Sequence, residues 1–153
     1  MKIEKEINQK KPFKNQLQKV SINIMFTASW INKVQQDALK AHDLTVQQYN
    51  ILRILRGMDG EPATIKLLTE RMIDKMSNAS RLVDKLLLKE LVKRDECKND
   101  RRRVDIYITE KGLHTLEVAS ESLESIFIDN NDVLSFEETE LLSDLLDKLR
   151  DIV

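Results

Sequence analysis

The chain has 153 residues, of which 33% are charged, and its formal net charge at pH 7 is -1. A chain of this length can bury a core of its own, so we expect one compact domain in all. Its single cysteine, Cys97, excludes an intrachain disulfide and a cysteine cluster for a metal, and its 3 glycines and 2 prolines favour a helix-rich fold.

The near-neutral total hides an uneven distribution of charge. Residues 1–62 carry 10 basic and 6 acidic side chains, residues 64–103 carry 12 and 7, and residues 113–153 carry 2 and 11. A basic middle joined to an acidic C-terminal segment suggests that one face meets a polyanion. A helical protein with unevenly charged faces gives the same pattern, so charge alone leaves both interpretations open.

Two observations bear on the compartment of the protein. No 18 apolar residues run together, and the N-terminal segment MKIEKEINQKKPFKNQ lacks the apolar stretch of a signal peptide. We therefore expect a cytoplasmic protein without a membrane partner.

The segment from Phe13 to Ala41 is predicted to form one long amphipathic helix. Apolar residues recur every seven positions along it, and further apolar residues widen the stripe. These positions are Leu17, Val20, Ile22, Ile24, Phe26, Trp30, Ile31, Val34 and Ala38. Such a helix is about 40 Å long, too long for a small core to cover, so we expect part of it to pack on another chain.

A helix-turn-helix is predicted next. Thr45 followed by Gln48 is a capping-box pattern that opens a helix, and the glycines and proline of residues 57–62 end it. Thr64 can cap a short helix, IKLLTERM. After a break near Asp74, the segment KMSNASRLVDKLLLKE is predicted to form the second helix of the motif, with a buried stripe of Met76, Leu82, Val83, Leu86 and Leu87.

A β-hairpin and two further helices complete the predicted elements. The runs LVKRDEC and RVDIYIT have strand character and flank a polar tip, KNDRR. Thr109 is expected to cap a helix that continues through Ile126, and Ser135 with Glu138 forms a second capping box. The last helix has a leucine stripe wide enough for helix pairing, at Leu141, Leu142, Leu145, Leu146 and Leu149.

A helix-turn-helix followed by a hairpin between long helices resembles the MarR (multiple antibiotic resistance regulator) family of bacterial transcription regulators. The matching segments are LTVQQYNILRIL, SNASRLVDKLLLKELVKR and NDRRRVDIYITEKG. The family's wing signature is Asp-x-Arg followed by a strand that ends in Leu/Ile-Thr-x-x-Gly. Here it is carried by Asp100, Arg102, Ile108, Thr109 and Gly112. The resemblance covers essentially the whole chain.

The resemblance implies a mainly α fold with a small β-hairpin wing, in which a winged helix-turn-helix is flanked by long dimerisation helices. Residues 1–44 would be the N-terminal dimerisation helix, 45–109 the DNA-binding region and 110–153 the C-terminal dimerisation helices. The implied function is a sequence-specific, double-stranded-DNA-binding regulator, typically a ligand-responsive repressor that acts as a homodimer on a palindromic operator. The chain has no enzyme motif, so we expect neither catalysis nor a cofactor.

Two other functions fit the same residues. A winged helix can be a protein-interaction module whose basic face meets an acidic protein, and the composition of the wing does not distinguish this from DNA binding. A helical protein that binds a small molecule without affinity for DNA is the third possibility. Salt-sensitive binding to duplex DNA separates the first function from both alternatives.

The candidate DNA contacts lie at the start of the second helix and on the wing. The N-terminal residues of a recognition helix face base edges, where Asn can pair with adenine and Arg with guanine. Ser and Asn also favour any exposed helix start. In the family, an aspartate braces the arginine that enters the minor groove, a role that falls here to Asp100 and Arg102. The expected contacts are Thr64, Lys75, Ser77, Asn78, Ser80, Arg81, Lys85, Asp100, Arg101, Arg102 and Arg103.

Glu90 departs from the family pattern, which often has glycine after the recognition helix. Glycine suits a left-handed helix terminator, and another residue there costs roughly 1 kcal/mol. We therefore expect the end of this helix to differ locally, away from the DNA edge.

The remaining expectations concern dimerisation and sensing. The interface is expected at Leu17, Val20, Ile24, Leu141, Leu142, Leu145, Leu146 and Leu149. Many family members bind small aromatic or phenolic effectors, and Met25, Phe26, Trp30 and Met58 could line such a site or could simply pack in a core. Cys97 is either an incidental strand residue or a redox sensor. His42 and His114 lack metal-ligand spacing, so no metal site is expected.

Overall fold

The computed structural model describes residues 1–97, 100–128 and 133–151, without the side chains of residues 96, 97, 100–103, 127 and 128. Within these ranges the chain is mainly helical with one antiparallel hairpin, as predicted. None of the described helices is both long and apolar enough to span a membrane. The elements in order are α1 (Ile3–Glu6), α2 (Gln16–Leu39), the 3-10 turn η1 (Lys40–His42), α3 (Val46–Arg56), α4 (Ile65–Arg71), α5 (Ala79–Leu88), β1 (Val92–Cys97), β2 (Asp100–Ile108), α6 (Glu110–Ile128) and α7 (Phe136–Arg150).

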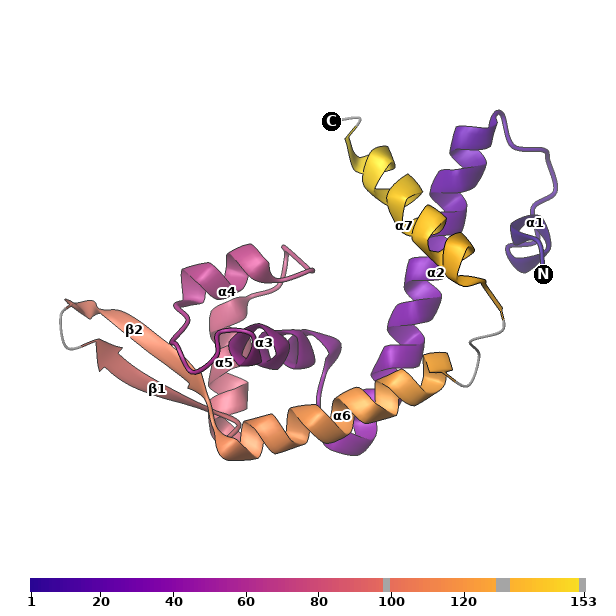
Figure 1. The fold of residues 1–153 in the computed structure, drawn as a ribbon. Coiled ribbons are helices and arrows are strands. Elements are labelled where there is room, and N and C mark those ends of the chain that lie inside the picture. The colour runs from indigo at the N-terminus through magenta and orange to yellow at the C-terminus, as the bar shows by residue number, and fades with distance from the viewer. Residues whose placement is uncertain (98–99, 129–132, 152–153) are drawn as a thin grey trace.

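The elements fall into two parts, which α6 connects (Figure 1). Helices α3, α4 and α5 gather beside the hairpin at one end of the molecule, and α6 runs from the hairpin toward α2. The opposite end holds α1, the first half of α2 and α7, together with the N-terminus. The long helix is shorter than the predicted Phe13 to Ala41, because Asn15 caps it at one end and η1 tightens its last turn.

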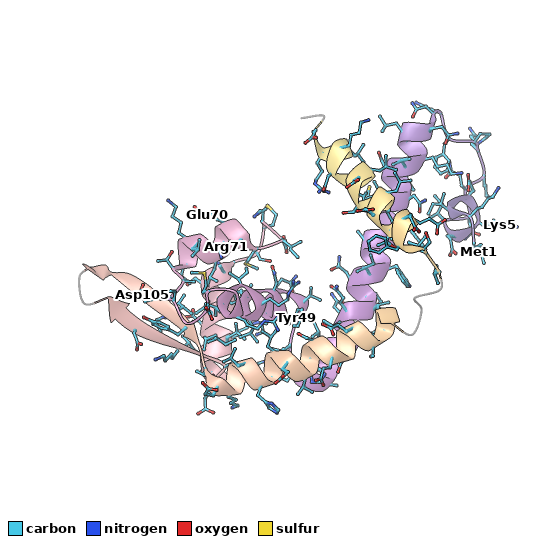
Figure 2. All side chains as sticks on the ribbon, viewed as in Figure 1. Met1, Lys5, Tyr49, Glu70, Arg71 and Asp105 are labelled. Carbon is cyan, nitrogen blue, oxygen red and sulfur yellow. The ribbon has the colours of Figure 1, made fainter. Side chains whose placement is uncertain are left out.

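The core lies under the helix-turn-helix and against α6. Fully buried aliphatic side chains come from α3, α4, α5, β2 and α6, and each stabilises the fold by roughly 1.5–3 kcal/mol relative to exposure. They include Ile51, Leu52, Leu68, Val83, Leu86, Ile106 and Leu116. The Tyr49 hydroxyl also lies 3.0 Å from the Ser120 hydroxyl, so a polar contact joins α3 to α6 (Figure 2). Helix α7 contributes no buried residue among those described.

Both predicted capping boxes are present. The Thr45 hydroxyl accepts the Gln48 N–H at 3.2 Å, and the Gln48 side chain accepts the Thr45 N–H at 3.1 Å. Ser135 and Glu138 make the same reciprocal pair at the start of α7. These contacts satisfy backbone donors that the first helical turn leaves without partners, which explains why α3 and α7 begin where the sequence predicts.

The base of the hairpin is anchored to the helix-turn-helix. The strands pair antiparallel from Val92 opposite Ile108, and the register is irregular after Glu96. On its other edge β2 pairs with Ala63, just before α4. The Ala63 N–H donates to the Ile106 carbonyl at 2.9 Å, and the Ile106 N–H donates to the Ala63 carbonyl at 3.0 Å. The hairpin therefore extends from a fixed base.

The hairpin, α5 and α6 meet at Leu91. The Leu91 carbonyl accepts the Thr109 N–H at 3.1 Å, and the Thr109 hydroxyl accepts the Gly112 N–H at 3.0 Å, which confirms the predicted cap. A Cβ atom at Gly112 would overlap the Leu91 carbonyl oxygen and crowd Ile108. Only glycine lets α6 start this close to the end of α5, which gives a physical reason for the last residue of the wing signature.

The expectation that the end of α5 would differ locally at Glu90 was wrong, because the helix is followed by a left-handed residue in the pattern that glycine favours. Glu90 has φ 61°, and the Leu91 N–H donates to the Leu86 carbonyl at 3.0 Å, as in a Schellman terminator. The Glu90 side chain pairs with Lys111 at 2.9 Å. The backbone therefore adopts the conformation that glycine favours, although the residue is a glutamate.

Replacing Glu90 by glycine should stabilise the protein, because the left-handed conformation costs a non-glycine residue roughly 1 kcal/mol. We expect Glu90→Gly to raise Tm by about 3 °C in a thermal melt. Glu90→Gln removes the charge of the Lys111 pair and keeps the strained backbone, so it should give no gain. A Tm for Glu90→Gly at or below that of Glu90→Gln would contradict this account.

Candidate nucleic-acid interface

Helix α5 presents one apolar and one polar face. Ala79, Val83 and Leu86 are buried in the core, whereas Ser80, Arg81 and Lys85 are exposed. The exposed set contains two cations and a hydroxyl, groups that suit phosphates and base edges. Three of the predicted contacts therefore share one solvent-facing surface.

Asn78 is exposed and caps α5. Its Oδ1 accepts the Arg81 N–H at 3.0 Å. Bidentate pairing with adenine uses the same oxygen together with the amide nitrogen. In this conformation the amide N–H groups are therefore the part of Asn78 that the cap leaves available to another partner.

The helix begins later than the sequence suggested, because an acidic turn precedes it. Asp74 accepts the Met76 N–H at 3.0 Å and the Ser77 hydroxyl at 2.7 Å. The Ser77 hydroxyl bond, and then the Met76 N–H, lower the pKa of Asp74. The expectation that Met76 is buried was wrong: its side chain is 94% exposed, because it lies in the turn rather than on the helix.

Two other predicted contacts are already engaged by neighbouring groups. Thr64 caps α4, accepting the Leu67 N–H at 3.2 Å. The Lys75 ammonium donates to the Glu70 carbonyl at 2.5 Å, near the end of α4, where Glu70 and Arg71 are labelled in Figure 2. Thr64 thus has a demonstrated role in starting a helix, and Lys75 stays exposed at the edge of the turn.

The wing residues are placed only in part. Asp100 to Arg103 form the first four residues of β2, while their side chains, with Lys98 and Asn99, lie outside the described residues. An ion pair that sequence reasoning missed ties the wing to α5: Arg94 of β1 lies 2.8 Å from Asp84. Their separation of 10 residues on two different elements gives no local pattern by which it could be found.

The four candidate effector residues do not share one described pocket. Met25 and Trp30 are exposed on α2, and Phe26 lines a surface cavity of about 320 Å³ with α1 residues and Lys19. Met58 instead packs against the core, and its sulfur accepts a hydrogen bond from Arg71 at 3.3 Å. Three of the four therefore lie on α2, and the fourth belongs to the winged helix.

The candidate interface residues on α2 and α7 are largely open to solvent. Leu17 is 57% exposed and Leu141 58% exposed. Exposed apolar side chains also continue beyond the predicted set. The exposed members on these two helices are Leu17, Val20, Met25, Phe26, Trp30, Phe136, Leu141, Leu142 and Leu145, and Ile24, Leu146 and Leu149 are half-buried.

The two histidines and the cysteine lie on different elements. His42 lies 2.8 Å from the Ser122 hydroxyl, and His114 is exposed. Cys97 ends β1, and its side chain lies outside the described residues. No group of three or more potential metal-binding side chains occurs in the described part of the chain.

Comparisons with known proteins agree with the arrangement of a helix-turn-helix followed by a hairpin. The MarR family model matches residues 44–104, which span the helix-turn-helix and most of the hairpin. No curated protein matches the chain. The family resemblance read from the sequence is thus confirmed over the winged helix.

Several solved structures share the fold. A MarR-like transcription regulator from Bacillus cereus has 21% identity and a TM-score of 0.77, over 89% of this chain and 96% of that one. An organohalide-sensing transcriptional regulator, solved with 2,4-dichlorophenol, has 22% identity and a TM-score of 0.80, over 94% and 86%. The Bordetella bronchiseptica regulator BpsR, whose DNA binding is regulated by 6-hydroxynicotinic acid, has 21% identity and a TM-score of 0.76, over 94% and 100%.

The capping role of Asn78 can be measured without DNA. Asn78→Ala should lower the free energy of unfolding by about 1 kcal/mol in a urea titration, whereas Asn78→Asp keeps an acceptor for the Arg81 N–H and should retain most of it. Ser80→Ala changes an exposed residue in the same turn and serves as the control. Equal stability of Asn78→Ala and Ser80→Ala would show that the cap contributes nothing.

Proposed function

We propose that this chain, with a MarR-family winged helix at residues 44–104, binds double-stranded DNA as a homodimer and regulates transcription. The observation that carries the proposal is the exposed face of α5, where Ser80, Arg81 and Lys85 lie together and an ion pair links the helix to the arginine-bearing hairpin. Such a face fits the major groove, which admits an α-helix and presents acceptors to cations.

The wing supplies the second proposed contact. Arg101, Arg102 and Arg103 are consecutive at the start of β2. The minor groove attracts arginine where it narrows, and phosphates attract it anywhere along the backbone. We assign Arg102 to the minor groove, with Asp100 as its brace, and Arg101 and Arg103 to supporting phosphate contacts. The anchoring of β2 to Ala63 supports this assignment, because a fixed base limits where the strand can reach.

The proposed homodimer follows from the apolar faces of α2 and α7. Large aliphatic side chains such as Leu17 and Leu142 are about half exposed in the single chain, and large exposed apolar patches mark interaction sites. A two-fold dimer would place two α5 helices about 34–36 Å apart, which matches successive major grooves and a palindromic operator.

The proposed regulation is ligand-responsive repression. Among the structural neighbours, one was solved with 2,4-dichlorophenol, and another has its DNA binding regulated by 6-hydroxynicotinic acid. Both are small aromatic compounds with hydroxyl groups. For this chain we propose an effector of the same chemical class, and α2, with Met25, Phe26 and Trp30, is the part of the chain that offers exposed apolar and aromatic side chains to it.

The wing assignment can be tested by fluorescence anisotropy on a labelled duplex from the region upstream of the gene. Arg102→Ala should weaken binding about tenfold, because a charge-assisted hydrogen bond is lost, and the slope of log K against log salt should become shallower. Arg150→Ala, the same change at the exposed end of α7, is the matched control. Unchanged binding by Arg102→Ala would refute the assignment, and a wild-type chain that binds acidic proteins but no duplex would favour the protein-interaction alternative.

The dimer can be tested by sedimentation velocity. Leu141→Glu with Leu145→Glu should convert the dimer to a monomer, because burying two carboxylates in an apolar interface is strongly unfavourable. Both positions are exposed in the single chain, so its fold should persist. Leu88→Glu, also exposed but on α5, should leave the dimer intact. A double variant that remains dimeric would place the interface elsewhere.

A further inference from the structure

Two apolar side chains in the turn before α5 are exposed to solvent. Ile73 is 80% exposed and Met76 is 94% exposed. Most of the other exposed apolar side chains lie on α2, on α7 or just before α7, where the proposed dimer would cover them. The turn is on the winged helix instead, so the surface proposed for dimerisation does not account for it.

Polar contacts hold this turn in place. The Asn50 side chain accepts the Ile73 N–H at 3.0 Å, and Asp74 accepts the Met76 N–H at 3.0 Å. The Ser77 hydroxyl closes the turn on Asp74 at 2.7 Å. Hydrogen bonds on both sides therefore fix the backbone that carries Met76, and the side chain is directed away from the core.

Met76 lies in the turn that leads into α5, next to the exposed Lys75. Arg81 and Lys85 are exposed on the helix that begins three residues later, at Ala79. An exposed apolar side chain beside a lysine, at the start of a helix that exposes further cations, is complementary to a polyanion that also offers an apolar group. In the major groove of DNA that group is the C5-methyl of thymine. Methionine is long, unbranched and polarisable, and it adapts to a small target of this kind.

We infer that Met76 packs against the 5-methyl group of a thymine in the bound duplex and so selects an A·T pair at one position of each half-site. The inference rests on the proposed binding of duplex DNA and adds a specificity-determining residue to it. Met76 differs in kind from the hydrogen-bonding residues of α5, because it distinguishes bases by a methyl group rather than by donors and acceptors.

The test compares thymine with uracil, which lacks only this methyl group. A binding site is first selected with the full chain from random-sequence duplexes, and each dT is then replaced in turn by dU. The wild-type chain should lose affinity about fourfold at one thymine of each half-site, the effect of one buried methyl group. Met76→Ala should bind the dT and dU duplexes equally at that position, and Met76→Leu should retain the preference.

Leu88→Ala is the matched control, because Leu88 is 86% exposed at the other end of α5 and should keep the wild-type profile. Met76→Ala with the wild-type dU penalty at every thymine would overturn the inference and leave the proposed function standing. A changed sedimentation coefficient of DNA-free Met76→Ala would also overturn it, since Met76 would then contact protein. A wild-type chain without preference for any duplex would overturn both proposals.

Discussion

The close approach of α6 to Leu91 is the constraint on which the rest of the winged helix depends. The Leu91 N–H closes the end of α5, its carbonyl accepts the Thr109 N–H, and Gly112 leaves no side chain between α6 and that carbonyl. One residue thus fixes where α5 ends, where the hairpin returns and where α6 begins. Because these elements share an anchor, the hairpin cannot shift along α5 without moving α6.

Ion pairs further restrict how α5 is oriented relative to the hairpin and α6. Three ion pairs at the surface connect this region to its neighbours. Lys89 pairs with Asp43 after η1, Asp84 of α5 pairs with Arg94 of the hairpin, and Glu90 pairs with Lys111 of α6. Exposed pairs contribute little to stability, so their effect is mainly geometric. They also weaken as salt screens them. The orientation of the hairpin relative to α5 is therefore expected to depend on ionic strength.

Local sequence signals predicted most of the fold. Thr45 with Gln48, Ser135 with Glu138 and the Thr109 cap each involve residues within three positions, and each begins a helix as expected. Helix α5 starts later than the sequence predicts, because Asp74 draws the backbone of residues 76 and 77 into a turn that competes with the helix.

Contacts between distant segments could not be predicted in this way. The Ala63–Ile106 bridge and the His42–Ser122 contact join residues whose approach depends on the packing of whole helices. The Ala63–Ile106 bridge also limits the strand edge that other molecules could pair with. It covers the outer edge of β2 at Ile106, near the base of the hairpin, and β1 carries the charged residues Lys93, Arg94 and Asp95. Charged residues on a strand edge discourage pairing with strands of other molecules, so the hairpin can project from the body of the protein without acting as a template for aggregation.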